Sequence, residues 1–262
     1  MIASLTIKNG QNKGAGLVIA LLADVHSNLE ALSACLAHAN EGGAGRYAFL
    51  GDLVGYGADP QGVVDIVARY AAQGAIVVKG NHDAAVEKRA GYMNDTTTEA
   101  IDWTRKVLPE DRKAFLARLP LCLRDESMCF VHASAASPER WHYVDSPAAA
   151  QKSAEAAQTP YTFSGHVHDQ VLYYQGTNGK MSAFRPLQGS PVSVRNHRRW
   201  LALVGSVGQP RDRNPAAAYA LFDTSREQIT FHRVPYDHLA AARKIRQAGL
   251  PASIAYRVEM GI

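Results

Sequence analysis

Five short apolar runs in the first two thirds of the chain each end directly in a group of polar residues. The first three runs are separated by segments with helical spacing, which is typical of a layered α/β fold. In open α/β sheets, ligands bind just beyond the carboxyl ends of the strands. We therefore expect one cleft built from polar groups that lie far apart in the sequence. The five runs are residues 17–23, 46–50, 75–79, 128–132 and 161–165.

Helices are expected between the first strands. Leu29, Leu32 and Leu36 recur at helical spacing and predict a buried helix face. Asp59 followed by Pro60 predicts the start of a second helix, since aspartate caps helices and proline suits the first helical position.

The pattern changes after Gly165, where short alternating runs separated by turn residues predict further strands. Thr-Asn-Gly-Lys at 177–180 is a strong hairpin signal. A last helix is predicted over 237–247. Residues 84–119 are predicted as mostly helical, broken by a polar segment at 90–98 that we interpret as a mobile loop or lid.

No linker, repeat or low-complexity tract divides the 262 residues, so we predict a single domain over 1–262, with 1–16 as a lead-in and 250–262 as a C-terminal tail. Lys8 and Lys13 precede a short apolar run that imitates a signal peptide, but cleavage there would delete the first strand. No apolar stretch approaches the ~20 residues that span a bilayer. A cytoplasmic protein with three small buried thiols is expected.

The charge of the chain is mildly basic, with a formal net charge of +4. This excess is too small to indicate nucleic-acid binding, which stays an open but less favoured alternative. The basic cluster at 195–199 is interpreted as a solvated turn before a strand. Four other histidines are interpreted as surface or core residues: His38, His142, His232 and His238.

The polar groups at the strand ends have the chemistry of metal ligands. Carboxylate, amide and imidazole groups suit Mn, Fe, Zn or Co, and the lack of thiolates argues against a structural cysteine zinc site. One tetrahedral ion cannot use so many ligands, whereas two ions about 3.5–4 Å apart can. The candidates are Asp24, His26, Asp52, Asn81, His82, Asp83, His132, His166 and His168.

Spacing within the blocks predicts which ligands share an ion. Asp24 and His26 are two residues apart, so in an extended segment they point to the same side. The same holds for His166 and His168, unless the backbone twists and sends them to neighbouring ions. A glycine precedes three of the blocks and lets the backbone approach the site closely.

The blocks Asp-Val-His, Gly-Asp, Gly-Asn-His-Asp, Val-His and Gly-His-Val-His, in this order, resemble the calcineurin-like metallophosphoesterase family. The resemblance covers roughly residues 17–223. Two further segments, GDLVGYGADP and GSVGQPRD, resemble a bacterial branch related to diadenosine tetraphosphatases and serine/threonine phosphatases. The resemblance implies a two-sheet αββα sandwich. Departures at Val167, at 169–170 and at 203–204 concern loop shape and leave every ligand in place.

The resemblance also implies two metal sites that share one carboxylate. The first ion would be held by Asp24, His26, Asp52 and His168. The second would be held by the bridging Asp52 together with Asn81, His132 and His166.

The implied reaction is phosphoester hydrolysis. Two cations would lower the pKa of a bridging water, and the resulting hydroxide would attack phosphorus in line with the leaving group. His82 would stabilise the transition state or protonate the leaving oxygen, with Asp83 orienting its ring. The candidate substrate contacts are Asn81, His82 and Arg211.

The preferred function is a phosphatase acting on a small phosphoester or a phosphoprotein. A phosphodiesterase or nuclease on the same centre is the alternative among enzymes, and a non-catalytic protein-binding scaffold is the alternative outside them. Taken singly, Asp24, Asp52 and Asn81 would be turn or cap residues and His132 a core histidine. All seven ligands and His82 are present together, which favours an enzyme.

Overall fold

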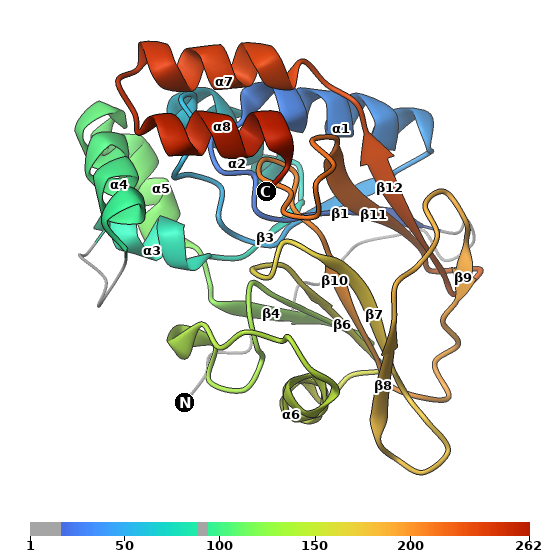
Figure 1. Ribbon diagram of the computed structural model, residues 1–262. Coiled ribbons are helices and arrows are strands. Elements are labelled where there is room, and N and C mark those ends of the chain that lie inside the picture. The colour runs from blue at the N-terminus through green and yellow to red at the C-terminus, as the bar shows by residue number, and fades with distance from the viewer. Residues whose placement is uncertain (1–16, 88–93) are drawn as a thin grey trace.

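The computed structural model describes residues 17–87 and 94–262, so the lead-in expected at 1–16 lies outside the described residues. Two six-stranded sheets pack face to face, and helices cover their outer faces (Figure 1). This is the mixed α/β, two-sheet sandwich that the sequence predicts, and the prediction is confirmed.

The first sheet has the strand order β3-β2-β1-β11-β12-β9. Strands β1, β2 and β3 are parallel, and β11 joins β1 in antiparallel orientation. The carboxyl ends of the three parallel strands therefore meet at one edge. The strands are β1 Val18–Leu22, β2 Arg46–Phe49, β3 Ile76–Val77, β9 Val192–Ser193, β11 Ala217–Asp223 and β12 Gln228–Val234.

The second sheet has the order β4-β5-β6-β10-β7-β8. Its central strands β5, β6 and β10 are parallel, and the hairpin predicted around 177–180 joins β7 to β8. The strands are β4 Cys122–Asp125, β5 Met128–Val131, β6 Tyr161–Ser164, β7 Gln170–Gln175, β8 Met181–Phe184 and β10 Trp200–Val204.

Strand β1 is buried on both faces, which explains why its sequence is apolar without alternation. Ile19 and Leu21 belong to the core between the two sheets. Ala20 and Leu22 belong to the core between the first sheet and its helices. The strand is thus held from both sides where it leads into Asp24.

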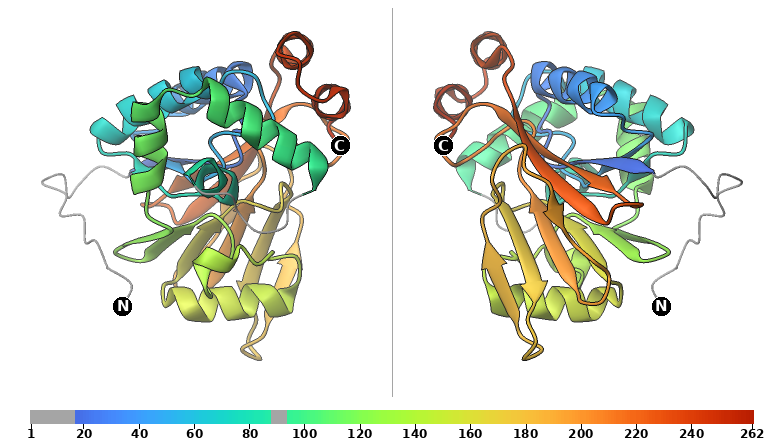
Figure 2. Two further views of the ribbon diagram at one scale, coloured as in Figure 1. Left: turned by 90° about the vertical axis from the view of Figure 1, so that its left-hand side faces the viewer. Right: turned by 90° about the vertical axis from the view of Figure 1, so that its right-hand side faces the viewer.

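Helices cover both outer faces of the sandwich, with α1, α2 and α5 over the first sheet and α6 on the opposite side against the second (Figure 2). Helices α7 and α8 pack on each other, and α7 also packs on α1. No helix within the described ranges is long and apolar enough to cross a bilayer. The helices are α1 Leu29–Glu41, α2 Pro60–Ala72, α3 Asn81–Glu87, α4 Asp95–Val107, α5 Glu110–Arg118, α6 Pro147–Ala157, α7 His238–Gln247 and α8 Ala252–Met260.

Several local predictions need correction. Residues 250–262 are not a tail, because they contain helix α8, whose buried residues pack against α7. Part of the expected loop at 90–98 is helical, since α4 begins at Asp95, and residues 90–93 lie outside the described residues. Asp59 precedes α2 but makes no side-chain cap bond; its carboxylate accepts from Lys244 instead. Cys122 is only half-buried.

Candidate metal centre

The polar blocks lie at the carboxyl ends of five strands: β1, β2, β3, β5 and β6. The structure brings the predicted ligands together there, and it buries all of them except Asn81, which is half-buried. Three groups of acidic and imidazole side chains have ligand atoms within 4.8 Å of one another. The first group is Asp24, His26 and His168, and the second is Asp52, His132 and His166; a third, formed by His26, Asp52 and His82, lies between them.

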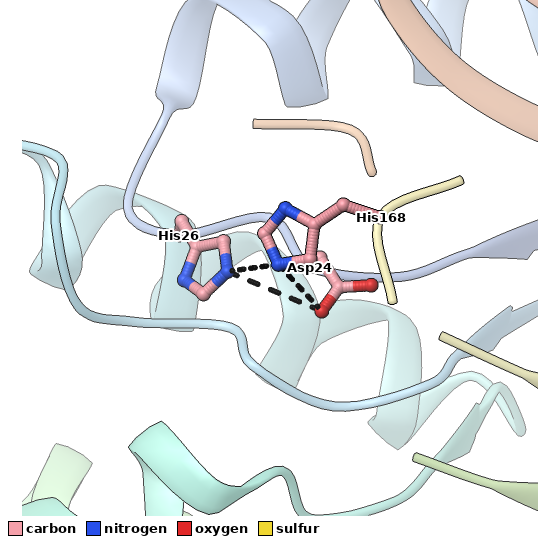
Figure 3. Close-up of side chains that lie close together, drawn as sticks. All are labelled: Asp24, His26 and His168. Carbon is pink, nitrogen blue, oxygen red and sulfur yellow. Dashed lines mark hydrogen bonds and ion pairs between the residues drawn. The ribbon is translucent and has the colours of Figure 1, made fainter. Parts of the chain in front are cut away.

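The first group joins the turn after β1 to the turn after β6 (Figure 3). Nε2 of His26 lies 3.2 Å from Nε2 of His168. Oδ1 of Asp24 lies 3.4 Å from His168 Nε2 and 4.0 Å from His26 Nε2. Two ligands about 2.1 Å from a shared ion lie roughly 3–3.5 Å apart. The two distances from His168 Nε2 fall in this range, and the distance from Asp24 to His26 is somewhat longer.

The second group is built around His132. Its Nε2 lies 3.1 Å from Oδ1 of Asn81 and 3.1 Å from Nδ1 of His166. The same Nε2 lies 3.4 Å from Oδ2 of Asp52. Four residues from four different strand ends therefore direct donor atoms to a second common point.

Asp52 lies between the two groups. Its Oδ2 is 3.4 Å from His132 Nε2 on one side and 3.8 Å from His26 Nε2 on the other. Its Oδ1 accepts a hydrogen bond from the backbone N–H of His82 at 2.9 Å, which orients the carboxylate. This position suits a carboxylate shared by two cations.

The hydrogen bonds of His26 and His168 test whether the residues fit a metal. Nδ1 of His26 faces the carbonyl of Val54 at 3.3 Å, and Nδ1 of His168 faces the carbonyl of Gln209 at 2.6 Å. A carbonyl only accepts, so both Nδ1 atoms carry the proton and both Nε2 atoms present lone pairs. Two lone pairs 3.2 Å apart in a buried site repel unless a cation lies between them. The donor set therefore fits a metal ion.

The electrostatics of the site agree with this arrangement. Burial lowers the pKa of both His26 and His168 well below the ordinary value, so both rings are neutral at neutral pH. Burial raises the pKa of Asp24 to about 7, and the nearby charge of Asp52 adds to the rise. Burial lowers the pKa of His132, but the charge and hydrogen bond of Asp52, the charge of Asp24 and the carbonyl of Leu50 together outweigh burial and raise it to about 9. Without a metal, a proton on His132 balances the carboxylate of Asp52.

Backbone turns, and not an extended chain, place the ligands. Asp24, His26 and Asp52 have positive φ angles of 53°, 49° and 51°, and His166 and His168 both have 68°. Asp24 and His26 do lie in the same group, as predicted. The predicted reason is wrong, because the segment between them is a turn and not an extended strand. His166 and His168 point to different groups, so the twisted alternative is the one observed.

Gly80 is required by a close approach of two loops. A Cβ atom at this position would overlap Oδ1 and the backbone nitrogen of Asp52. The turn before α3 therefore packs directly on the carboxylate that lies between the two groups. Any larger residue at position 80 would displace the Asp52 carboxylate from both groups of side chains.

Asp83 does not orient the ring of His82, which corrects the role expected for it. Its Oδ1 accepts from the backbone N–H groups of Leu53 and Val54 at 2.9 and 3.3 Å, and its Oδ2 accepts from Gly80 N at 2.9 Å. The buried carboxylate instead ties the turn after β2 to the turn after β3. It positions the loops and touches no imidazole that we describe.

Tyr56 is a residue that sequence reasoning missed. Its ring packs at 4.6 Å from the ring of His82 and 4.8 Å from the ring of His26. Its hydroxyl lies 3.0 Å from Oγ1 of Thr97 in α4. Gly55 lies against Nδ1 of His82, where a Cβ would clash. No spacing rule indicates Tyr56, because only the turn after β2 brings it there.

His82 itself lies beside Asp52, with its Nε2 3.9 Å from Oδ2. Its Nδ1 is buried and has no hydrogen-bond partner in the described part of the chain. Distance alone therefore groups His82 with His26 and Asp52 and does not separate it from the ligands.

Arg211 approaches the site from the segment after β10. Its guanidinium donates to Oε1 of Gln209 at 3.2 Å, and its buried Nε has no partner among the described residues. Its positive charge contributes to lowering the pKa of His168, after burial, which is the larger cause. The predicted substrate contact is thus a partly free cation near the first group.

The loop after His132 contributes two aromatic residues that the sequence did not single out. Trp141 packs edge-on at 5.9 Å from the ring of His132. Tyr143 stacks on the ring of His166 at 4.2 Å with an interplanar angle of 23°. The basic cluster at 195–199, by contrast, forms the turn before β10, in agreement with its interpretation as a solvated turn.

Comparisons with known proteins identify the family of the chain. The model of the calcineurin-like phosphoesterase superfamily domain matches residues 17–227. An uncharacterized protein of Methanocaldococcus jannaschii is 32% identical over 250 residues, covering 93% of this chain and 98% of that protein. A metallophosphoesterase structure from Sphaerobacter thermophilus has a TM-score of 0.85 at 34% identity, covering 95% of this chain and 100% of the other.

A hypothetical protein from Pyrococcus horikoshii shares the fold, with a TM-score of 0.76 at 19% identity over 94% of this chain and 99% of the other. The matched family region contains all five polar blocks, and the two relatives above 30% identity extend over nearly the whole chain. The chain belongs to the calcineurin-like phosphoesterase superfamily and is a metal-dependent phosphoesterase.

Proposed function

We propose that the protein hydrolyses phosphomonoesters, of small molecules or of phosphoproteins, at a centre of two transition-metal ions. The observation that carries this proposal is the pair of neutral imidazoles, His26 and His168, whose lone pairs meet 3.2 Å apart beside a carboxylate. The second group supports a second ion, because Asn81, His132 and His166 converge in the same way. Nitrogen and oxygen donors of this kind suit Mn, Fe, Zn or Co.

Two bound cations would supply an activated water and neutralise charge on the phosphoryl oxygens. Asp52 would hold both ions, since its Oδ2 lies between the two groups. Backbone carbonyls of Val54, Leu50 and Gln209 keep the Nδ1 proton of three imidazoles in place and so direct each Nε2 inward.

His82 and Arg211 would act on the substrate. Nε2 of His82 lies 3.9 Å from Asp52 Oδ2, and its N–H would stabilise the charge that develops on the leaving oxygen or protonate that oxygen. Arg211 would donate an N–H to a phosphoryl oxygen, because its buried Nε has no partner within the described ranges. Asp83 would contribute only by fixing the two turns that carry Asp52 and His82.

The test is the metal content per chain of protein purified without chelator, together with Mn-dependent hydrolysis of p-nitrophenyl phosphate and bis-p-nitrophenyl phosphate. We expect close to two ions per chain and a higher kcat/KM for the monoester. Asp52→Asn should lose most of both ions and at least about 100-fold in kcat, because a shared ligand supports both sites.

Two other results would contradict the proposal. A preference for the diester would favour the phosphodiesterase or nuclease alternative. No metal and no turnover after addition of Mn, Fe, Co or Zn would favour a non-catalytic scaffold.

A further inference from the structure

We propose that Tyr143 is a stacking surface for the leaving group of the substrate, and that the enzyme prefers phosphomonoesters whose leaving group carries a planar aromatic ring. This inference rests on the proposed function. It concerns the part of the substrate that the metal ligands do not contact.

The position of Tyr143 relates it directly to the site. Its ring lies parallel to the ring of His166 with centroids 4.2 Å apart. His166 in turn directs its Nδ1 to within 3.1 Å of His132 Nε2, inside the second group. A group leaving from phosphorus near that point therefore has the ring of Tyr143 within reach.

About half of Tyr143 is exposed to solvent. The residue is 53% exposed, and His166 is its only aromatic neighbour among the described residues. An exposed tyrosine beside a buried cluster of imidazoles offers a surface for a second aromatic ring, since offset stacking is favourable for aromatic pairs.

The backbone on both sides of Tyr143 is anchored. The carbonyl of His142 accepts from Ser134 N at 3.2 Å. Val144 is buried, and its carbonyl accepts from the hydroxyl of Tyr173 at 3.2 Å. The exposed ring is thus held in place before a ligand arrives, which reduces the entropy lost on binding.

Charges around Tyr143 suit a phosphoester. Burial raises the pKa of its phenol while the charge of Arg211 opposes the rise, so the phenol and the guanidinium lie within electrostatic reach. The phenol stays neutral, and Arg211 supplies the nearby positive charge for the phosphoryl group. The two residues would hold the two ends of one ester.

The experiment compares benzyl phosphate with cyclohexylmethyl phosphate. Both lose a primary alkoxide and both carry a six-membered ring, but only the benzyl ring is planar and aromatic. We expect the wild-type kcat/KM to be about 3- to 10-fold higher for benzyl phosphate than for cyclohexylmethyl phosphate, because an aromatic pair contributes binding free energy of that size. The difference should appear mainly as a lower KM.

Variants identify the residue responsible. Tyr143→Leu should bring the ratio of the two kcat/KM values close to one, whereas Tyr143→Phe keeps the ring and should keep the ratio. Tyr256→Leu is the matched control, because Tyr256 lies on α8 and is 52% exposed. It should leave the ratio at the wild-type value.

A wild-type ratio near one, or an unchanged ratio in Tyr143→Leu, would overturn the inference. So would an equal fall on both esters accompanied by loss of metal, which would show that Tyr143 only supports His166. If p-nitrophenyl phosphate is hydrolysed with the same kcat/KM by wild type and Tyr143→Leu and neither other ester is hydrolysed, the proposed function stands and the inference fails. If none of the three is hydrolysed with added metal, both fail.

Discussion

The imidazole of His82 is held by aromatic packing and lies beside the carboxylate of Asp52, whereas Asp83 bonds only backbone N–H groups among the described residues. Tyr56 packs on it at 4.6 Å, Gly55 lies against its Nδ1, and Asp52 accepts from its backbone N–H. Such a ring keeps its orientation only while its neighbours keep theirs. The hydroxyl of Tyr56 extends this support to Thr97 on α4.

We therefore predict that Tyr56→Leu lowers kcat about 10-fold on alkyl phosphates and less on p-nitrophenyl phosphate, because a misplaced proton donor matters most for a poor leaving group. Tyr56→Phe keeps the ring, loses one hydrogen bond, and should change kcat by less than about threefold. The measurement is kcat over esters of increasing leaving-group pKa. Equal losses across that series would show that Tyr56 supports the fold and does not position His82.

The roles of some site residues can be predicted from the sequence, and the roles of others cannot. The resemblance points to His82 and to the ligands, because their blocks are recognisable by composition and order. It misassigns Asp83, whose three hydrogen bonds all go to backbone N–H groups of neighbouring turns. Tyr143 lies outside every recognised block, and Tyr56 lies inside the segment GDLVGYGADP without being singled out by it, since ring contacts across loops have no sequence period.

At the scale of elements, strand ends and the turns that follow them build the site. A second cluster of imidazoles lies outside the site, between helix α1 and the first sheet. His232 of β12 stacks on Tyr219 of β11 at 5.3 Å and lies 4.9 Å from the ring of His38 in α1. Burial, helped by His38, lowers the pKa of His232 to about 4. His38 and His232, two of the four histidines expected to be ordinary core or surface residues, therefore join α1 to the first sheet.

This cluster predicts acid sensitivity that is separable from the metal site. Between about pH 6.5 and pH 4 the unfolded chain binds a proton on His232 that the folded chain lacks, so stability falls as the pH falls. The free energy of unfolding is unaffected by this group above pH 6.5. It falls by about 1–2 kcal/mol as the pH drops to about 4, after allowance for the partial exposure of His232. His232→Gln should lose less stability between pH 7.5 and pH 5 than wild type in urea unfolding. Parallel curves for the two proteins would contradict the assignment.

Element prediction succeeded where periodicity is strong. Strand β1, predicted over 17–23, extends over Val18–Leu22, and helix α1 begins at Leu29, the first residue of the predicted apolar face. Helix α8 was missed because its nine residues bury only one narrow stripe, with Ile254, Ala255 and Val258 buried against α7. So short an apolar stripe predicts a helix only when the helix that it packs against is known.

On the scale of the whole molecule, the metal centre joins the two sheets. Asp24 and Asp52 follow strands of the first sheet, whereas His132 and His166 follow strands of the second. A cation shared between them therefore cross-links the two halves of the sandwich. Without it, buried imidazoles and carboxylates lose their compensation.

We predict that chelation lowers the melting temperature by about 5–15 °C, because ions bound only to the folded state contribute a few kcal/mol. Differential scanning calorimetry with EDTA, followed by Mn²⁺ addition, measures the shift. Asp52→Asn should respond to EDTA far less than wild type. A melting temperature that EDTA leaves unchanged in the wild type would mean that the ions do not link the sheets.

The sequence by itself determined the α/β class, the order of the strands that carry the site, and the chemistry of the donor set. These follow from local properties: apolar periodicity, residue type, and polar blocks placed directly after strands. Only the tertiary structure decided which donors meet. His26 and His168 are 142 residues apart and follow strands of different sheets, so their contact depends on left-handed turns and on the packing of the two sheets, which no local pattern encodes. The same long-range packing directs the carboxylate of Asp83 to backbone N–H groups. It also places Tyr56 against His82 and Tyr143 against His166.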